Sequence, residues 1–292
     1  MRGIPCVRVP RNLGEKTRRK LIELGCFERN AKIVSDSDFI YIPTKRMLGE
    51  EELLLLGEAE QMVRDFEPIE KKKSTEDILG FTPSYEIIGD IAILKEGDER
   101  IGNAILETHK NIKVVLEPLT PVKGVCRTRK FRVIAGENRK ETMYVEHGCR
   151  YFVHLEKVYF NPRLATERKR VVDQVEKNET VIDMFAGVGP FTIPIAKKAK
   201  RVIAIDINPD AVEYLKKNLA LNRIKNVEVI CGDVREVAPR LEGEGDRIIM
   251  NLPQSASEFL KEGMRMAKDR GIIHYYEIRE EGKLFEEIPG VE

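Results

Sequence analysis

The sequence predicts an α/β protein in which a doubly wound, Rossmann-like parallel sheet follows two small α+β domains. Three observations predict this fold class. From residue 161 onward, short β-branched strands alternate strictly with helical stretches, as in parallel sheets covered by helices. Residues 85–160 contain mostly strand patterns, and residues 67–77 form a charged, apolar-poor segment typical of a linker. We therefore expect domains at residues 1–66, 67–158 and 159–292.

Residues 6–64 show the pattern strand, helix, strand, helix, beginning with the short extended segment CVRV. The first helix is expected in NLGEKTRRKLIELG, with Asn12 as its N-cap and Gly25 as its end. The next strands are expected in AKIV and FIYIP. GEEELLLLGEAEQMVRDF, at residues 49–66, predicts one continuous helix.

The middle of the chain combines strand patterns with concentrated positive charge. Strands are expected in EIIGDIAIL, in KVVLEPL and in the long segment from ETMYV to EKVYF, where EHG at residues 146–148 predicts a hairpin turn. Residues 121–170 contain thirteen Lys and Arg against five Glu, although the whole chain has a net charge of only +1. We therefore expect one face of the protein to suit phosphate groups.

Aromatic side chains lie among these basic residues. Proteins that read single-stranded RNA combine the two residue types, because cations hold the backbone while rings stack on bases. The alternative is that the run is only a solvated charged face. The side chains concerned are Arg127, Arg129, Phe131, Arg132, Tyr151, Phe152, Tyr159 and Phe160.

The C-terminal part is expected to contain five parallel strands, in TVIDMF, RVIAID, VEVICGD, DRIIMN and GIIHYY. A helix in AVEYLKKNLALNR would place Val212, Leu215 and Leu219 on one stripe. Polar residues and glycines follow four of the strands, at the edge where α/β sheets bind ligands. They are Asp183 with Gly187 and Gly189, then Asp206, then Gly232 with Asp233, and finally Asn251 with Leu252 and Pro253.

These strand ends predict a nucleoside cofactor. Gly187 and Gly189 allow the backbone to approach a ligand before the next helix begins. Asp206 suits a ribose diol, and Asp233 can accept a hydrogen bond from an adenine amino group. The loop lacks the third glycine of a dinucleotide site, which favours S-adenosylmethionine over NAD. The alternative is that each acid alone is a helix cap or a turn residue.

Composition excludes several classes of protein. No apolar stretch is long enough to span a membrane, and the N-terminal segment becomes charged too early for a signal peptide. The five cysteines are scattered, without a CxxC pair or a metal-ligand spacing. We therefore expect a cytoplasmic protein with reduced thiols, no membrane contact and no bound metal.

The motifs DMFAGVGPF, AIDINP, GDVRE and MNLPQSA, preceded by AGENR and VYFNPRLATER, resemble those of the archaeal and eukaryotic tRNA (guanine-37-N1)-methyltransferases. The likeness covers most of the chain. It implies a class I methyltransferase domain that uses S-adenosylmethionine, a middle RNA-binding domain, and an N-terminal domain that touches the outer corner of the tRNA. The implied substrate is guanosine 37 in the anticodon loop, and we expect a monomer.

The resemblance also implies site residues, wherever the motifs match. It implies that Arg127, Tyr159 and Glu167 contact the target base. It implies cofactor contacts for another set, which consists of Arg168, Phe185, Asp206, Ile207, Asp233, Val234 and Asn251.

The chemistry of the implied reaction suits these residue types. Guanine N1 carries a proton, so its lone pair is unavailable to attack a sulfonium methyl group. Glu167 is the candidate base, and Arg127 would stabilise the negative charge that develops on O6. Tyr159 would stack on or orient a flipped base. Asn251, held by Pro253, would fix the guanine edge or the methionine end of the cofactor.

Each of these roles has a simpler alternative. Glu167 would only pair with Arg163 or Arg170 on a helix. Arg127 would contact a phosphate group, and Tyr159 would be a core residue. Two other functions also stay open. One is a wyosine-pathway methyl- or aminocarboxypropyl-transferase acting at the same tRNA position, and the other is a non-catalytic tRNA-binding protein that keeps the cofactor pocket.

The C-terminus departs from the expected pattern. This fold class normally adds an antiparallel pair of strands after the fifth parallel strand, but only REEGKLFEEIPGVE, residues 279–292, follows here. We expect either a short sheet or a truncated chain, with one sheet edge left unpaired.

Overall fold

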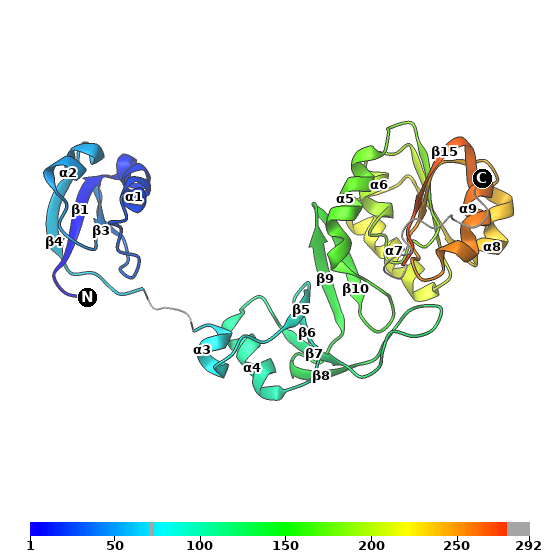
Figure 1. Cartoon of the computed structure of the whole chain (residues 1–292), viewed down its shortest axis with the longest axis horizontal. Coiled ribbons are helices and arrows are strands. Elements are labelled where there is room, and N and C mark those ends of the chain that lie inside the picture. The colour runs from blue at the N-terminus through cyan, green and yellow to red at the C-terminus, as the bar shows by residue number, and fades with distance from the viewer. Residues whose placement is uncertain (70–72, 279–292) are drawn as a thin grey trace. The chain divides into compact units, whose positions relative to one another are not determined.

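A computed structural model describes residues 1–69 and 73–278 (Figure 1). The chain divides into two compact units, Met1–Ser74 and Thr75–Glu292. Each unit has its own hydrophobic core. The division falls inside the segment 67–77, which the sequence predicts to be a linker.

The first unit is a four-stranded antiparallel sheet with two helices, and its strands are ordered β2-β3-β1-β4. One face of the sheet packs against both helices through the buried side chains of Val7, Val9, Leu21, Ile42 and Leu56. The elements are β1 (Ile4–Pro10), α1 (Gly14–Glu23), β2 (Val34–Ser35), β3 (Phe39–Pro43), α2 (Glu50–Leu56) and β4 (Glu60–Arg64).

Asn12 does not cap α1, so that prediction is wrong. The chain first makes a 3-10 turn at Arg11–Leu13, and α1 begins only at Gly14, without a side-chain cap. The predicted end of the helix at Gly25 is confirmed, because this residue has a φ of 70° in the left-handed region. The strand predicted in AKIV is reduced to Val34–Ser35.

The single helix predicted over residues 49–66 is also wrong. Helix α2 ends at Leu56, because Gly57 has a φ of 73° and turns the chain away. The following residues form β4, which pairs with β1 and completes the sheet. The tertiary pairing with β1 therefore overrides the local helical pattern.

The second unit begins with another four-stranded sheet, ordered β5-β6-β7-β8. Strands β6 and β7 are parallel, and α4 is the crossover between them. The strand-rich sequence prediction misses α4, whose N-terminus is capped by Asp98. The elements are α3 (Thr75–Leu79), β5 (Tyr85–Ile88), β6 (Ile91–Leu94), α4 (Glu99–Thr108), β7 (Val114–Pro118) and β8 (Phe131–Gly136).

Strands β9 (Glu141–Glu146) and β10 (Cys149–His154) form a separate antiparallel hairpin. The turn predicted at EHG is confirmed, with positive φ at both His147 (45°) and Gly148 (72°). A two-stranded hairpin is marginally stable by itself. This hairpin instead shares a core with helix α7, to which it contributes Cys149, Tyr151 and Val153.

The C-terminal sheet is the predicted doubly wound parallel sheet. Its five strands are ordered β13-β12-β11-β14-β15, and helices cover both of its faces (Figure 1). The strand order reverses between β11 and β14, and such a switch point is where ligands bind. The strands are β11 (Thr180–Asp183), β12 (Arg201–Asp206), β13 (Val227–Cys231), β14 (Gly245–Met250) and β15 (Ala267–Tyr275).

The helices of this sheet include the predicted amphipathic one, α7, whose stripe of Val212, Leu215 and Leu219 is buried. They are α5 (Ala165–Gln174), α6 (Thr192–Ala196), α7 (Pro209–Leu221), α8 (Val234–Val237) and α9 (Leu260–Met266). None of the described helices is both long and apolar enough to cross a membrane. Within the described residues β15 is an edge strand, and the expectation for residues 279–292 lies outside them.

Two buried polar contacts hold the β9–β10 hairpin against the parallel-sheet domain. Asn218 of α7 accepts a hydrogen bond from the Phe152 amide (2.7 Å) and donates to the carbonyls of Phe152 (3.1 Å) and Val188 (3.0 Å). Arg168 of α5 forms an ion pair with Glu146 at the end of β9, with 2.7 Å between Nε and Oε1. Asn218 is fully buried and Arg168 is 2% exposed, so both contacts are shielded from water.

We predict that Asn218→Ala lowers the free energy of unfolding by about 1–3 kcal/mol, because it leaves buried main-chain groups of the hairpin unpaired. Urea denaturation measures the change. Lys216→Ala, on the exposed face of the same helix, is the control and should have little effect. Equal stability of the two variants would show that the amide does not hold the hairpin.

Candidate active site

The C-terminal ends of β11 and β12 carry the glycine loop and an acid that braces it. Gly187 and Gly189 have φ values of 54° and 91°, which glycine adopts without strain. The Gly187 amide donates to Asp206 Oδ2 (2.6 Å), and the Asn208 amide donates to Oδ1 (2.8 Å). Burial raises the pKa of the Asp206 carboxyl. Each of its oxygens keeps a second lone pair, so Asp206 is still able to accept from a ribose diol.

Asp183, at the end of β11, is a second acid on this edge and is only 1% exposed. Thr192 Oγ1 donates to its Oδ2 (2.7 Å), whereas Oδ1 is buried and has no hydrogen-bond partner in the part of the chain that the structure describes. Burial raises the pKa of Asp183 to about 7. A buried oxygen without a hydrogen-bond partner is rare, and this one belongs to the residue that ends β11 just before the glycine loop.

The other predicted cofactor residues also follow the C-terminal ends of the strands. Phe185, Ile207 and Asn251 come after β11, β12 and β14, and Ile207 is 44% exposed, as an apolar contact for an adenine ring would be. Asp233 and Val234 come after β13. Asp233 also caps α8 through a main-chain amide, so the cap is one of its roles. The cofactor contacts of these residues remain predictions.

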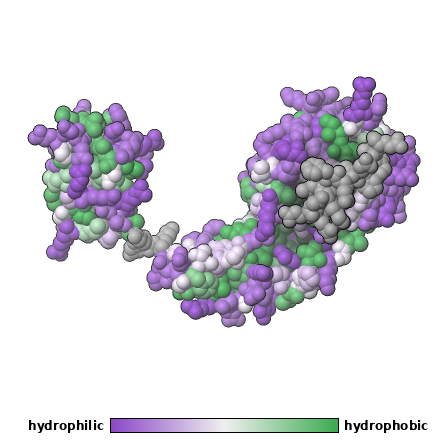
Figure 2. Space-filling model, viewed as in Figure 1, coloured by the Kyte–Doolittle hydropathy of each residue, from purple (hydrophilic) through white to green (hydrophobic). Residues whose placement is uncertain are grey.

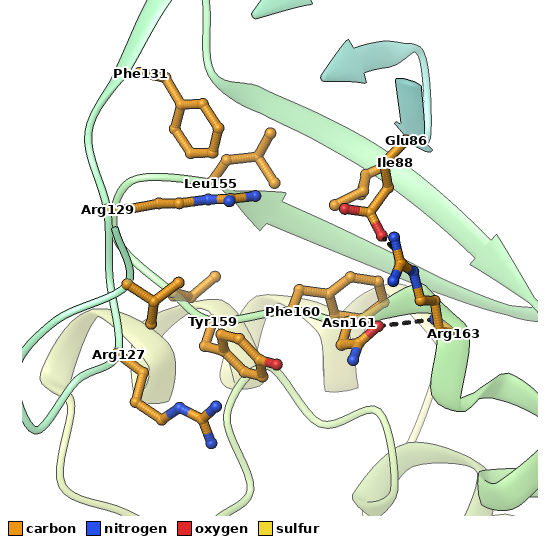
Figure 3. Close-up of a pocket in the computed structure, with 12 residues that line it drawn as sticks. Glu86, Ile88, Arg127, Arg129, Phe131, Leu155, Tyr159, Phe160, Asn161 and Arg163 are labelled. Atoms are coloured by element: carbon orange, nitrogen blue, oxygen red, sulfur yellow. Dashed lines mark hydrogen bonds and ion pairs between the residues drawn. The ribbon is translucent and has the colours of Figure 1, made fainter. Parts of the chain in front are cut away.

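A cavity of about 220 Å³ contains two of the predicted base-contacting residues (Figure 3). The Arg127 guanidinium lies 4.3 Å from the centroid of the Tyr159 ring, in a cation–π contact. Tyr159 is 38% exposed, so the alternative that it is a core residue is wrong. A Cβ atom built on Gly187 would lie 4.0 Å from the Tyr159 carbonyl oxygen, which places the cavity next to the glycine loop.

Glu167, in the first turn of α5, is held outside this cavity. Arg170 donates to both of its carboxylate oxygens (2.7 and 2.6 Å), and the Tyr276 hydroxyl donates to Oε1 (2.7 Å). Of the two partners that the sequence left open, Arg170 is the one observed, since Arg163 pairs with Glu86 instead. The hydrogen bond from Arg170 lowers the pKa of Glu167 to about 2.

Arg168 is engaged by the protein itself. Besides its ion pair with Glu146, it donates from Nη1 to the Asn161 carbonyl (3.0 Å), in the segment that joins Tyr159 to α5. The guanidinium therefore holds the segment that carries Tyr159. Its predicted contact with the cofactor remains a prediction.

Sequence reasoning missed the side chains that position these groups. Tyr276 holds Glu167, Glu146 holds Arg168, and Asn218 holds the glycine loop through the Val188 carbonyl. Only Tyr276 had a signal in the sequence, because it ends the HYY run at a strand end. The contacts themselves all join residues far apart in the chain, which no local pattern reveals.

A nucleoside cofactor without a pyrophosphate fits this switch point. A parallel sheet that binds such a cofactor at its switch point is typical of the class I methyltransferases, which use S-adenosylmethionine. Matches to protein-family models also indicate a methyltransferase. Residues 142–289 match the TRM5/TYW2 methyltransferase domain, residues 6–52 the tRNA methyltransferase 5 N-terminal domain, and residues 67–139 the TYW2 N-terminal domain. The chain belongs to the TRM5/TYW2 methyltransferase family, and the predicted fold class and cofactor are thereby confirmed.

Individual relatives cover most of the chain. The tRNA (guanine(37)-N(1))-methyltransferase Trm5b of Pyrococcus abyssi is 44% identical and aligns with 94% of this chain and 84% of its own length. The solved complex of aTrm5 and tRNALeu has a TM-score of 0.68 at 37% identity and covers 92% of this chain and 86% of the relative. The tRNA(Phe) (4-demethylwyosine(37)-C(7)) aminocarboxypropyltransferase of Methanocaldococcus jannaschii is 37% identical over 69% of this chain and 81% of the relative.

We predict that Asp206→Ala weakens S-adenosylmethionine binding about 10- to 100-fold, because the ribose loses a charged hydrogen-bond acceptor. Titration calorimetry on the folded variant measures this. Asp210→Ala is the control, since Asp210 lies on the surface nearby and pairs with Lys157. Wild-type affinity in Asp206→Ala would remove this residue from the cofactor site.

Proposed function

We propose that this protein transfers a methyl group from S-adenosylmethionine to N1 of guanosine 37 in the anticodon loop of tRNA. Two relatives named tRNA (guanine(37)-N(1))-methyltransferase Trm5b, and the solved complex of aTrm5 and tRNALeu, support the proposal. The observation that carries it in this structure is the Arg127–Tyr159 pair beside the glycine loop. It offers a ring to stack on a base and a guanidinium to bind its oxygen, within reach of the cofactor edge.

The reaction requires the guanine ring to lose its N1 proton as the nitrogen attacks. S-adenosylmethionine, when bound, supplies an electrophilic methyl group on a sulfonium. Arg127 would donate to O6 and so stabilise the negative charge that spreads onto this oxygen. Tyr159 would stack on the flipped base, and Asn251 would orient the guanine edge or the methionine end of the cofactor.

Glu167 is the proposed proton acceptor, and its contact with Arg170 would have to break before it can take up the proton. A carboxylate with a pKa of about 2 is a weak base for a nitrogen-bound proton. Entry of the target base therefore has to replace Arg170 as the partner of Glu167, which would bring the pKa back up. Tyr276 would keep the carboxylate oriented during this exchange, since it holds Oε1 from a different element.

The proposal also assigns a separate role to each of three parts of the chain. The unit that contains residues 1–66 would contact the outer corner of the tRNA, and Lys16 on the exposed side of α1 suits a phosphate contact. Residues 67–158 would hold the anticodon loop, and residues 159–292 would carry out methyl transfer. The interleaved arginines and aromatics of the middle segment support this assignment.

A second candidate function is aminocarboxypropyl transfer to a wyosine precursor. It is favoured by the similarity to the aminocarboxypropyltransferase and by the match of residues 67–139 to the TYW2 N-terminal domain. The two reactions take different groups from the same cofactor, so they add different masses to the nucleoside. A non-catalytic tRNA-binding protein would add none.

Mass spectrometry of a nuclease digest tests all three functions together. Unmodified tRNA and, in parallel, tRNA that carries the 4-demethylwyosine precursor are incubated with the protein and S-adenosylmethionine and then digested to nucleosides. The proposal expects 1-methylguanosine and S-adenosylhomocysteine in equal amounts from the unmodified tRNA. An aminocarboxypropyl adduct, or bound tRNA without any product, would replace the proposal with one of the two alternatives.

We predict that Glu167→Gln lowers the single-turnover rate about 10²- to 10⁴-fold, because the amide cannot accept the N1 proton. Arg127→Ala should slow the same step about 10²- to 10³-fold through loss of O6 stabilisation. Rapid quench at saturating tRNA and cofactor measures both. Asp173→Asn, which changes a surface carboxylate on the same helix, is the control. A wild-type rate in Glu167→Gln would mean that Glu167 is only an ion-pair partner.

We predict that Arg170→Gln shifts the acid limb of the pH–rate profile to higher pH. Arg170 lowers the pKa of Glu167, so its removal should return that pKa toward the ordinary value for Glu, about 4.3. The carboxylate works as a base only when deprotonated, so the variant should lose rate at a pH where the wild-type protein is still active. Single-turnover rates at subsaturating tRNA give the comparison, down to the lowest pH that keeps the protein folded, because they report the ionisation of Glu167 in the free protein, where Arg170 still pairs with it. Superimposable profiles would contradict the coupling.

A further inference from the structure

Residues 119–130, between β7 and β8, form a hairpin that extends beyond the four-stranded sheet (Figure 1). The Leu119 amide donates to the Lys130 carbonyl at the base of this hairpin (2.8 Å), and further main-chain hydrogen bonds join its two arms. The proposed reaction uses only Arg127 from it, whose guanidinium stacks on the Tyr159 ring. The tip of the hairpin has no role in that mechanism.

The tip, residues 124–127, exposes an apolar side chain. Val125 is 75% exposed, which is the highest value for a large apolar side chain among the described residues of the second unit. Figure 2 shows apolar side chains among hydrophilic ones over the surface of this unit, and a single exposed valine is ordinary on such a surface. Whether Val125 has a function therefore depends on what lies beside it.

The tip lies next to the edge of the parallel sheet that is expected to bind the cofactor. Arg127 ends the tip and stacks on Tyr159, whose carbonyl oxygen lies 4.0 Å from a Cβ atom built on Gly187. The Gly187 amide in turn donates to Asp206 at the end of β12 (2.6 Å). A continuous series of contacts thus joins the tip to the carboxylate that is expected to bind the ribose.

The acids at the end of β12 also act on the tip. Partial burial raises the pKa of the Cys126 thiol, and the carboxylates of Asp206 and Asp210 raise it further. Salt screens such an effect over about 10 Å, so the thiol lies within reach of both acids. Ile207, between the two acids in sequence, is 44% exposed. Adenosine bound here would have one side covered by the strand ends, whereas protein sites bury most of a small ligand. The cofactor site therefore needs a second wall.

We propose that the tip of the hairpin is this second wall, and that Val125 packs against the adenosine part of S-adenosylmethionine. Val125 and Arg127 project from the same turn, so a ligand that holds the valine also fixes the main chain of the arginine. Bound cofactor then positions the guanidinium for the target base, and the two ligands bind with positive coupling. The wall is independent of the proposed function, whereas the coupling through Arg127 rests on it.

Alkylation of Cys126 tests the wall in the unaltered protein, because this exposed thiol lies directly beside Val125. The protein is treated with iodoacetamide at alkaline pH, and peptide mass spectrometry follows Cys126 with and without ligands. Saturating S-adenosylhomocysteine or adenosine should each slow its alkylation about tenfold or more, whereas methionine should not. In Leu119→Cys, the new thiol at the base of the hairpin is the control, and its alkylation should not respond to these ligands. An unchanged rate at Cys126 overturns the inference, and so does protection by tRNA alone.

A substitution at the tip tests the apolar contact. Val125→Ala should weaken binding of S-adenosylhomocysteine about 3- to 10-fold in titration calorimetry, because it removes two methyl groups from the contact. Leu119→Ala, which shortens an exposed apolar side chain at the base of the same hairpin, is the matched control and should bind like the wild-type protein. Wild-type affinity in Val125→Ala overturns the contact.

The coupling has its own measurement. Saturating S-adenosylhomocysteine should tighten binding of an anticodon stem-loop to the wild-type protein about fivefold or more, and Val125→Ala should reduce this factor. An equal factor in the two proteins overturns the coupling through the tip. Protection of Cys126 by adenosine in a protein that forms no 1-methylguanosine overturns the proposed function instead and supports the wall.

Discussion

The buried guanidinium of Arg168 is the contact on which the candidate site depends. It joins α5 to the β9–β10 hairpin through Glu146, and it also holds the Asn161 carbonyl between Tyr159 and α5. Desolvation of two charges largely offsets their attraction, so such a pair is a poor source of stability. Removing one partner would instead leave a buried charge. The pair therefore fixes one arrangement of the hairpin, the tyrosine and the helix that begins beside Glu167.

The cofactor edge is fixed by a second set of contacts that reaches the same hairpin. Asp206 accepts from the Gly187 amide, while Asn218 binds both the Val188 carbonyl and the main chain of Phe152. The glycine loop is thus braced on one side by the strand end and on the other by α7. Because α7 also binds the hairpin, the glycine loop and the hairpin cannot shift independently. Transfer of a group between two bound molecules requires that the surfaces that bind them are fixed relative to each other.

The sequence predicts the parts of this structure that local patterns encode. The five parallel strands, the α7 stripe and the EHG turn follow from periodicity and turn chemistry, and the structure confirms them. Helix α4 and strand β4 were not predicted, because their conformation is decided by the sheets against which they pack. The ion pair of Arg168 and the hydroxyl of Tyr276 join residues distant in sequence, so no spacing rule reveals them.

Arg127 has an uncommon main-chain conformation and a buried donor without an acceptor. Its φ of 52° is uncommon for a side chain of this kind, and such conformations cost about 1–3 kcal/mol. Its Nε is buried and has no hydrogen-bond partner among the described residues. An unpaired buried donor of a charged group is costly, and the stacking contact with Tyr159 offsets only part of that cost. A guanine oxygen would supply the missing acceptor. Under the proposed mechanism, binding of the base and stabilisation of its charge would therefore coincide at Arg127.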